Sequence, residues 1–486
     1  MFLIPLFIFP ILGILNVILT KRHQERKTRI RGLQWSMALL TYFLLLWWSI
    51  PLHYGFSFHT SIEWLTLHQV KLNWGPLIFA IDVISIFFIG LTILLIPICI
   101  LVSWNSIRYL IKEFLISLFL IEILLIGVFT TLDILMFYVL FEGILIPMFI
   151  IIGVWGSREE KVRAAFYFFF YTLVGSLFML ICIFKIYELT GTTNYVTLLT
   201  LEIPTHLQIW LFIGFFLSLA VKIPMIPFHI WLPQAHVEAP VAGSVILAGI
   251  LLKLGGYGFI RFSFPLFPCA SEYLSPMVIV LSLIAIIYGS FTTCRQNDMK
   301  RLIAYSSVAH MGLVTLSIFT HSIEGLVASL FLMMAHGFVS SGLFMGVTVL
   351  YDRHHTRSIR YYRGVCSSMP LFAALMLCLT LANISFPSTC NFIGEFLSIL
   401  SAFQYAWWAG ALACSGVILS ATYALFMYNR IFFGSMTPMI LHNREITRRE
   451  FASLLPLLIP TLLLGILPKM LLCAMTMGSY ATVGSI

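Results

Sequence analysis

Apolar stretches of about 20 residues, each long enough to cross a lipid bilayer as a helix, recur along almost the whole chain. Hydrophobic residues make up 60% of the 486 positions and charged residues only 10%, which excludes a water-soluble globule. A helix pairs its backbone polar groups internally, so a bilayer-spanning chain of this kind is expected to be all-α. The sequence therefore predicts a polytopic membrane protein.

The apolar stretches predict about fourteen transmembrane helices. The stretch 391–432 is too long for one crossing and lies just after Pro387, so we expect one proline-broken helix over 368–403 and the next helix over 407–432. Helix fourteen is expected to end near Pro468, with only a short tail after it. The apolar stretches are 2–20, 34–52, 77–103, 114–131, 133–155, 164–187, 207–226, 240–260, 274–293, 302–320, 325–350, 368–386, 391–432 and 451–468.

Lysine and arginine are concentrated in a few short connections. Of the 28 such residues, 22 fall in six segments that follow helices one, three, five, nine, eleven and thirteen. Connections after odd-numbered helices share one side of a membrane, as the positive-inside rule expects, so both termini are predicted on the opposite side. The net charge of +9 then reflects topology and not nucleic-acid binding. The six segments are 21–31, 108–112, 158–163, 295–301, 353–363 and 430–449.

The nine cysteines and the glycine-rich segments show no cofactor pattern. The chain has no CxxC spacing, no Walker loop and no GxGxxG after a strand, and Gly255, Gly256 and Gly258 fall inside a predicted helix. The sequence thus predicts no nucleotide, iron–sulfur or haem site in this chain. The apolar N-terminus continues into further spans, so no cleavable targeting peptide is expected.

Lys222 lies in the apolar run 207–226 and is followed by Pro224 and Pro227. A charge at membrane depth usually faces a bundle interior or a hydrated path, and a proline-broken helix frees backbone groups that such a cavity satisfies. Glu142, in the middle of the fifth apolar stretch, is the expected counter-ion. In a low-dielectric site the two groups would alter each other's proton affinity, so small movements would load or release a proton. The alternative is a static structural ion pair.

Further polar residues lie inside the apolar stretches. Lys253 is central in a stretch with many small residues, which permit close helix packing. His310 and His336 could relay protons through water, or could make only helix–helix hydrogen bonds. Their occurrence together with two lysines and two glutamates favours the relay. Glu122 is either a second acid near Glu142 or a hydrogen-bonding group at the contact of helices four and five.

Glu395 follows Pro387 in helix twelve, much as Lys222 precedes Pro224 in helix seven. The two breaks are five crossings apart, and an odd offset reverses orientation, so helices four to eight and nine to thirteen are expected to be inverted repeats. The predicted parts are 1–105 with helices one to three, 106–265 and 266–434 with the two halves, and 435–486 with helix fourteen and a tail. The predicted line of proton sites across the membrane plane is Glu142, Lys222, Lys253, His310, His336 and Glu395.

His229 and His236 flank Trp231 and Pro233 near a predicted helix end. Their spacing fits no compact metal motif, so capping or water contact is favoured over metal binding. No metal site is expected in the chain.

Long motifs carry a family resemblance. Residues 221–240, VKIPMIPFHIWLPQAHVEAP, followed by AGS at 242–244 and LAGILLK at 247–253, closely resemble the antiporter-like membrane subunits of respiratory complex I. IAYSSVAH at 303–310 and NFIGE at 391–395 extend the resemblance over nearly the whole chain. Motifs of this length and spacing are highly specific.

The resemblance implies fourteen helices with inverted repeats, discontinuous helices seven and twelve, and proton translocation driven by redox chemistry elsewhere. It assigns a coupled pair to Glu142 and Lys222, a central relay to Lys253, connecting relays to His310 and His336, and a distal proton site to Glu395. This chain would hold no cofactor. FMN, iron–sulfur clusters, NADH and ubiquinone would bind to partner subunits.

The resemblance also implies partners and a location. The partners would be the other membrane-arm subunits, notably chains 2 and 5, accessory subunits, and membrane lipids such as cardiolipin at the basic face. The location would be the mitochondrial inner membrane, with the basic loops on the matrix side and both termini on the intermembrane-space side.

Three details test this resemblance. The short tail after Pro468 and the glutamate at 395 separate the chain from sister subunits that have a long lateral helix or a lysine there. Ser388 departs from the family, in which glycine commonly follows the proline. An Mrp-type cation/proton antiporter subunit shares the broken helices and charges and is the alternative function. A structural subunit with idle charges is a third interpretation.

Overall fold

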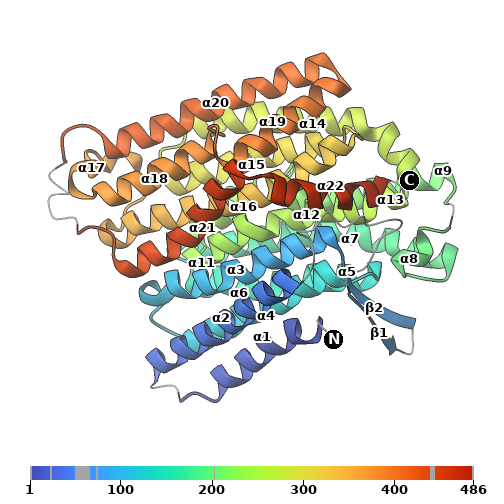
Figure 1. The fold of residues 1–486 in the computed structure, drawn as a ribbon, viewed down its shortest axis with the longest axis horizontal. Coiled ribbons are helices and arrows are strands. Elements are labelled where there is room, and N and C mark those ends of the chain that lie inside the picture. The colour runs from blue at the N-terminus through green and yellow to red at the C-terminus, as the bar shows by residue number, and fades with distance from the viewer. Residues whose placement is uncertain are drawn as a thin grey trace. The chain divides into compact units, whose positions relative to one another are not determined.

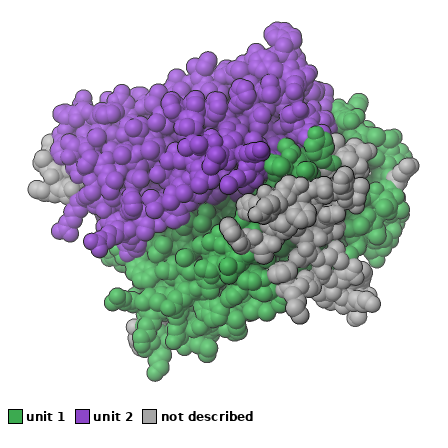
Figure 2. Space-filling view, in the orientation of Figure 1, with its two compact units in different colours: residues 1–222, 254–274, 473–486 green, residues 223–253, 275–472 purple. Residues whose placement is uncertain are grey.

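A computed structural model describes residues 3–21, 24–49, 66–72, 75–201, 203–437 and 444–483. The chain divides into two compact units, coloured separately in Figure 2. Unit 1 comprises Met1–Lys222, Leu254–Leu274 and Cys473–Ile486, and unit 2 comprises Ile223–Lys253 and Ser275–Leu472.

Unit 1 contains helices and one two-stranded sheet (Figure 1). Its elements are α1 (Leu3–Ile18), α2 (Glu25–Ser49), β1 (Thr66–Leu72), β2 (Gly75–Ile81), α3 (Val83–Ser106), α4 (Ile111–Thr130), α5 (Ile134–Gly143), α6 (Leu145–Trp155), α7 (Lys161–Thr190), α8 (Tyr195–Leu198), α9 (Thr205–Lys222), most of α12 (Leu252–Gly258), the π-helix η2 (Phe259–Ser263), α13 (Phe264–Leu266), the start of α14 (Pro268–Cys294) and most of α22 (Lys469–Val483).

The described part of unit 2 is entirely helical between its connections. Its elements are α10 (Trp231–Glu238), α11 (Val241–Ile246), the π-helix η1 (Leu247–Leu251), the rest of α14, α15 (Met299–Ile318), α16 (Ile323–His354), the 3₁₀ helix η3 (Ile359–Tyr361), α17 (Val365–Ser368), α18 (Pro370–Asn383), α19 (Cys390–Tyr405), α20 (Trp407–Phe432) and α21 (Arg448–Ile466).

Eleven helical segments among the described residues are long and apolar enough to cross a membrane, and Leu3–Ile18 and Pro370–Asn383 are shorter apolar helices. The prediction of a helical polytopic membrane protein is therefore confirmed. The count of fourteen crossings stays a prediction, as do the boundaries of the two inverted halves.

Both predicted helix breaks are present. Helix α9 ends at Lys222, and the next helix, α10, begins only at Trp231. Helix α18 ends at Asn383, α19 begins at Cys390, and α20 follows as a separate helix, which confirms the division of the long apolar region. A proline cannot continue the helical hydrogen-bond ladder, and this is the physical reason for each break.

The apolar stretch 77–103 is not a single helix, which corrects the sequence prediction. Residues 75–81 form β2, which pairs antiparallel with β1 in the register Thr66↔Ile81 and Leu72↔Gly75. Helix α3 begins only after Asp82, whose carboxylate accepts a hydrogen bond from the Ser85 amide at 2.8 Å. Aspartate is a preferred N-cap because its oxygen satisfies an unpaired amide of the first turn, so the helix starts there.

The short tail expected after Pro468 is itself helical. After α21 ends at Ile466 the chain forms another helix, α22, from Lys469 to Val483. Pro468 ends one helix and begins the next turn, because the amides of Leu471 and Leu472 both donate to its carbonyl oxygen. Proline favours the first turn of a helix, where its missing amide has no partner to lose.

Three of the six basic segments lie in unit 1, and they meet at one end of its helices. Arg29 donates to the Ile107 carbonyl at 2.7 Å, which joins the first segment to the second. Tyr109, in the second segment, donates to the Val154 carbonyl at 2.6 Å beside the third segment. Within this unit the basic connections therefore share one side, as the positive-inside rule predicts.

The three basic segments of unit 2 meet in the same manner. The Met299 amide donates to the Arg357 carbonyl at 3.0 Å, and the Gly364 amide donates to the Phe433 carbonyl at 3.2 Å. These backbone contacts connect the segments 295–301, 353–363 and 430–449 at one end of the unit.

Candidate functional site

Lys222 and Glu142 lie together inside unit 1. The Lys222 ammonium nitrogen is 3.9 Å from Oε1 of Glu142 and 4.2 Å from the centre of the Phe141 ring. Only 5% of the lysine side chain and 13% of the glutamate side chain are exposed. A distance of 3.9 Å permits electrostatic attraction but is too long for a direct hydrogen bond. The pair can therefore tighten or separate with a small movement.

Helix ends place these two side chains. Glu142 is the second-last residue of α5, and the Ile144 amide at the interruption before α6 donates back to the Glu142 carbonyl. Lys222 is the last residue of α9, which packs closely on α7 because Gly175 leaves space for Val221; a Cβ at Gly175 would lie 2.8 Å from the valine side chain. Glycine at this contact allows the backbones to approach.

Lys253 and His336 meet inside unit 2. The Lys253 nitrogen lies 2.9 Å from Nδ1 of His336, and Nε2 of the same ring lies 3.2 Å from the Ser307 hydroxyl. Ser307 has one proton and donates it to the Ile303 carbonyl, so it accepts from Nε2–H of His336. This hydrogen-bond network assigns Nδ1 as the acceptor for a proton of Lys253.

The π-helix η1 immediately precedes Lys253. The lysine nitrogen also donates to the Ala248 carbonyl within η1. A π-helical turn disturbs the regular backbone ladder and frequently occurs at functional sites. Here it provides a carbonyl partner to a fully buried lysine.

His310 and Glu395 extend this buried group. The ring centres of His310 and His336 are 5.7 Å apart, and Nδ1 of His310 lies 2.8 Å from Oε1 of Glu395. Only 3% of each side chain in the His310–Glu395 pair is exposed. The structure thus brings together four of the six predicted residues in unit 2, whereas the other two form their pair in unit 1.

The break before α19 contains two residues in the left-handed backbone region. Ser385 has φ 64° and Ser388 has φ 78°. Glycine adopts this region without the steric cost that a Cβ brings. Ser388 therefore adopts a backbone conformation that suits glycine better than serine.

His236 is the residue that sequence reasoning missed. Its ring is fully buried in unit 2 and stacks on Phe344, with ring centres 4.6 Å apart and planes at 2°. Neither ring nitrogen has a hydrogen-bond partner among the described residues, so the ring makes no capping contact there, and the water contact offered beside capping stays a prediction. Lys300 and Lys253 both act electrostatically on the ring. In the sequence His236 lies near Pro233 and a predicted helix end, and neither feature indicates that its ring is buried.

Glu122 lies inside unit 1, and its role as a second acid stays a prediction. It is fully buried on α4, and neither carboxylate oxygen has a hydrogen-bond partner among the described residues. It shares its helix face with Phe119, which packs against Gly13 of α1. Leu124, on another face of α4, packs against Gly143 of α5. Glu122 therefore does not point at the helix that carries Glu142.

His229 lies beside aromatic rings. Its ring centre is 6.1 Å from that of Tyr288 and 6.4 Å from that of Tyr305. Within the described ranges, no three histidine, cysteine, aspartate or glutamate side chains come together as metal ligands.

Arg261 belongs to a second buried ion pair in unit 1. Its guanidinium donates to Asp82, the N-cap of α3, at 2.8 Å, and lies 5.3 Å from the Tyr195 ring centre. Next to this pair the hydroxyls of Tyr257 and Ser85 are 3.1 Å apart. Burial raises the pKa of Tyr195 to about 12, although the nearby guanidinium opposes this shift, so its hydroxyl stays protonated. These contacts fasten the second half of the Val241–Leu266 span to α3.

The sequence identifies the class to which this fold and site belong. Residues 131–420 match the family described as NADH:quinone oxidoreductase/Mrp antiporter, TM. The match includes both helix breaks and all six predicted proton sites. The chain belongs to this family.

Relatives specify the resemblance further. The chain is 58% identical over 467 residues to NADH-ubiquinone oxidoreductase chain 4 of Metridium senile. The aligned region covers 96% of this chain and 95% of the relative. It is 50% identical over 472 residues to the protein of the same name from Arabidopsis thaliana. This aligned region covers 97% of this chain and 94% of the relative. The resemblance to complex I subunits is thereby confirmed.

Two solved structures share the fold. A chain of respiratory complex I from Thermus thermophilus with bound NADH has a TM-score of 0.89 and 29% identity, covering 100% of this chain and 99% of that chain. A chain of the Mrp complex from Dietzia sp. DQ12-45-1b has a TM-score of 0.84 and 20% identity, covering 98% of this chain and 96% of that chain. The second likeness shows the fold alone.

Proposed function

We infer that this chain is a proton-translocating membrane-arm subunit of respiratory complex I, a complex that catalyses NADH:ubiquinone oxidoreduction. The observation that carries this function is the buried polar run from Lys253 through His336 and His310 to Glu395, in a chain of this family. Ionisable residues are rare inside membranes and mark ion or proton pathways.

The Lys222–Glu142 pair is proposed to couple proton movement to conformation. At 3.9 Å a small separation weakens the attraction that holds the ammonium charged, and closer approach strengthens it. The pair therefore exchanges a proton with its surroundings as its distance changes. Redox energy reaches it through conformational and electrostatic changes from other subunits.

The proposed relay runs from Lys253 towards Glu395. Lys253 gives a proton to Nδ1 of His336, and the imidazolium then releases its Nε2 proton at the Ser307 side. His310 receives the proton next and passes it to Glu395. Each imidazole accepts a proton at one nitrogen and releases one at the other, which suits a relay.

We place His236 at the start of this relay on its basic side. Phe344, on which it stacks, lies eight residues beyond His336 along α16, or about 12 Å closer to the basic end. Lys300, in a basic segment, donates at 2.7 Å to the Ala239 carbonyl just beyond the same short helix. His236 thus lies between the basic connections and the Lys253–His336 contact.

His236→Phe is expected to slow proton pumping several-fold, because phenylalanine keeps the stack on Phe344 but cannot carry a proton. The measurement is proton uptake per NADH oxidised in membrane vesicles, with the amount of assembled complex determined in parallel. His206→Phe, at an exposed histidine of α9, is the matched control. Unchanged pumping in assembled His236→Phe complex would remove this residue from the relay.

The chain is proposed to hold no redox cofactor, with FMN, iron–sulfur clusters, NADH and ubiquinone on partner subunits. Its partners are membrane-arm subunits of the complex, and chains 2 and 5 are the proposed neighbours. The mitochondrial inner membrane is the proposed location, with the basic connections on the matrix side, both termini on the intermembrane-space side and cardiolipin at the basic face.

The experiment that tests this function is gentle solubilisation, separation by size, and assay of the fraction that contains the chain. NADH oxidation by quinone in a very large assembly is the expected result. A small assembly that exchanges sodium for protons without NADH would instead establish the Mrp-type antiporter, which has the same fold.

A further inference from the structure

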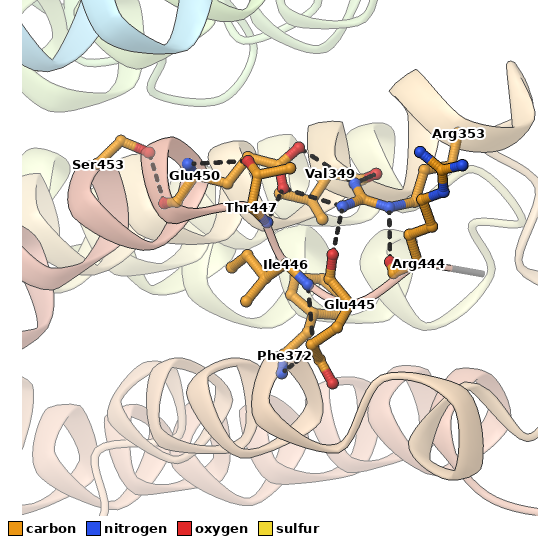
Figure 3. A network of polar contacts seen from close by, with 9 residues as sticks. All are labelled: Val349, Arg353, Phe372, Arg444, Glu445, Ile446, Thr447, Glu450 and Ser453. Carbon is orange, nitrogen blue, oxygen red and sulfur yellow. Dashed lines mark hydrogen bonds and ion pairs between the residues drawn. The ribbon is translucent and has the colours of Figure 1, made fainter.

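The start of α21 is fastened to the end of α16 by a two-fold ion pair (Figure 3). Nη2 of Arg353 lies 2.9 Å from Oε2 of Glu450, and Nη1 lies 3.2 Å from Oε1. Both side chains are largely buried. A bidentate guanidinium–carboxylate pair fixes orientation as well as distance, which a lysine cannot do.

Neighbouring groups strengthen this contact, which we name the Arg353–Glu450 clasp. Arg353 also donates to the Val349 carbonyl at 2.6 Å and to the Arg444 carbonyl at 3.2 Å. Oε2 of Glu450 accepts from the Thr447 amide at 2.8 Å in a capping box that starts α21. The clasp therefore fixes the first turn of α21.

The same network reaches α18, the first half of the broken helix twelve. Oε1 of Glu445 accepts from the Phe372 amide, in the first turn of α18, at 3.2 Å and from the Ile446 amide at 3.1 Å (Figure 3). Three helices, α16, α18 and α21, are thus joined at the basic end of unit 2.

The other end of α21 lies against the break between α18 and α19. A Cβ at Gly465, in the last turn of α21, would collide with the backbone carbonyl of Ser388 and lie 2.6 Å from the carbonyl carbon of Thr389. Helix α21 has 19 residues, and the 15 residues from Glu450 to Gly465 place the clasp about 22 Å from this contact. It packs against α16 and α19 between its two ends.

The break that touches Gly465 sets the start of the helix that carries Glu395. Thr389 is the residue immediately before α19, and Glu395 lies six residues later, about 9 Å along the helix. A second close contact holds α19 on α16, because a Cβ at Gly394 would lie 2.9 Å from the Leu332 backbone. A shift of the break therefore moves Glu395 relative to His310 on α15.

Few residues of α21 are fully buried. Its buried residues are Ser453, Leu454, Leu457 and Thr461, two of them small and polar. Pro456 and Pro460 each remove a backbone hydrogen bond from the middle of the helix. The contacts at the two ends therefore have a large part in fixing its position.

We propose that α21 is a positioning strut for the helix-twelve break: the Arg353–Glu450 clasp and the Gly465 contact together hold Glu395 at its working distance from His310. This inference rests on the proposed function of Glu395 as a distal proton site. Arg353, Glu450 and Gly465 are positioning residues, because they act on proton transfer through the break and not by touching the proton path.

The test compares five variants of the intact complex, Gly465→Ala, Arg353→Gln, the double exchange Arg353→Glu with Glu450→Arg, Glu395→Gln, and Gly465→Ala combined with Glu395→Gln. The readouts are assembled complex on native gels, NADH oxidation by a water-soluble acceptor, and protons pumped per NADH oxidised by quinone. Ile466→Ala and Arg360→Gln are the controls, since Ile466 is 67% exposed next to Gly465 and Arg360 is an exposed arginine of the same basic end.

We expect Gly465→Ala and Arg353→Gln to assemble, to keep the reaction with the soluble acceptor, and to pump several-fold fewer protons per NADH. The double exchange should restore pumping in part, because it rebuilds the ion pair but not the hydrogen bonds that Arg353 donates to the Val349 and Arg444 carbonyls or the one that Glu450 accepts from the Thr447 amide. Combining Gly465→Ala with Glu395→Gln should cause no further loss, since both act on the same proton site.

Two results would contradict different statements. Normal pumping by assembled Gly465→Ala and Arg353→Gln, with pumping lost in Glu395→Gln, overturns the strut alone. Normal pumping by assembled Glu395→Gln overturns the proton role of Glu395 and with it the proposed function of this site. If Gly465→Ala fails to assemble, Arg353→Gln and its double exchange still decide the inference.

Discussion

Lys222→Ala is expected to lower NADH-driven proton pumping about tenfold or more while the complex remains assembled. The substitution removes the ammonium that pairs with Glu142 at 3.9 Å and packs on the Phe141 ring at 4.2 Å. Glu142 then has no lysine with which to exchange a proton as the distance between the two groups changes. The measurement is proton pumping and quinone reduction in membrane vesicles, normalised to assembled complex.

Two further variants separate a titrating lysine from a fixed positive charge. Lys222→Arg should also pump poorly, because a guanidinium does not release its proton under physiological conditions. Lys185→Ala is the control, since Lys185 is an exposed lysine that pairs along its own helix with Glu188 at 3.0 Å. Normal pumping by assembled Lys222→Ala would reduce the pair to a structural contact.

Lys253→Met is the second large effect, with an expected loss of pumping of about tenfold or more. Methionine has nearly the same shape but cannot donate to Nδ1 of His336 or to the Ala248 carbonyl. The relay would then lack the proton donor on its His336 side. Protons pumped per NADH and the rate of quinone reduction should both fall in the assembled complex.

Leu251→Met is the matched control for this site. Leu251 is buried in the adjoining π-helical turn, and exchange of leucine for methionine conserves volume. We expect near-normal pumping from this variant. Equal pumping by Lys253→Met and Leu251→Met would show that the charge of Lys253 has no part in proton transfer.

The sequence predicted the broken helices because the cause of each break is local. Pro387 lies inside an apolar region that is too long for one crossing, and the structure has a break from 384 to 389. The sheet was missed because the residues of β2 are apolar like those of the following helix, and hydropathy alone does not distinguish them. Asp82, an N-cap type, was the available signal that α3 begins after it.

The candidate site was predicted in part. Charged residues are rare inside membranes, because each buried ionisable group needs a partner or a pathway. For this reason the sequence pointed to Lys222, Lys253 and Glu395. The actual partners depend on which helices pack together, so the contact of Lys253 with His336 came only from the structure. His236 was missed for the same reason, because sequence spacing does not report that its ring is buried against another helix.

The sequence by itself determined that the chain lies in a membrane, that it is helical and where its two helix breaks fall. Long apolar stretches, basic connections and prolines are local features of the chain, so the sequence shows them directly. Tertiary structure alone decided that Glu122 is fully buried on α4, that His236 is buried on Phe344, and that α21 reaches from Arg353 to the break at Ser388. These features depend on contacts between helices far apart in the sequence. Such contacts are set by close packing, in which a glycine on one helix makes space for a side chain or backbone of another.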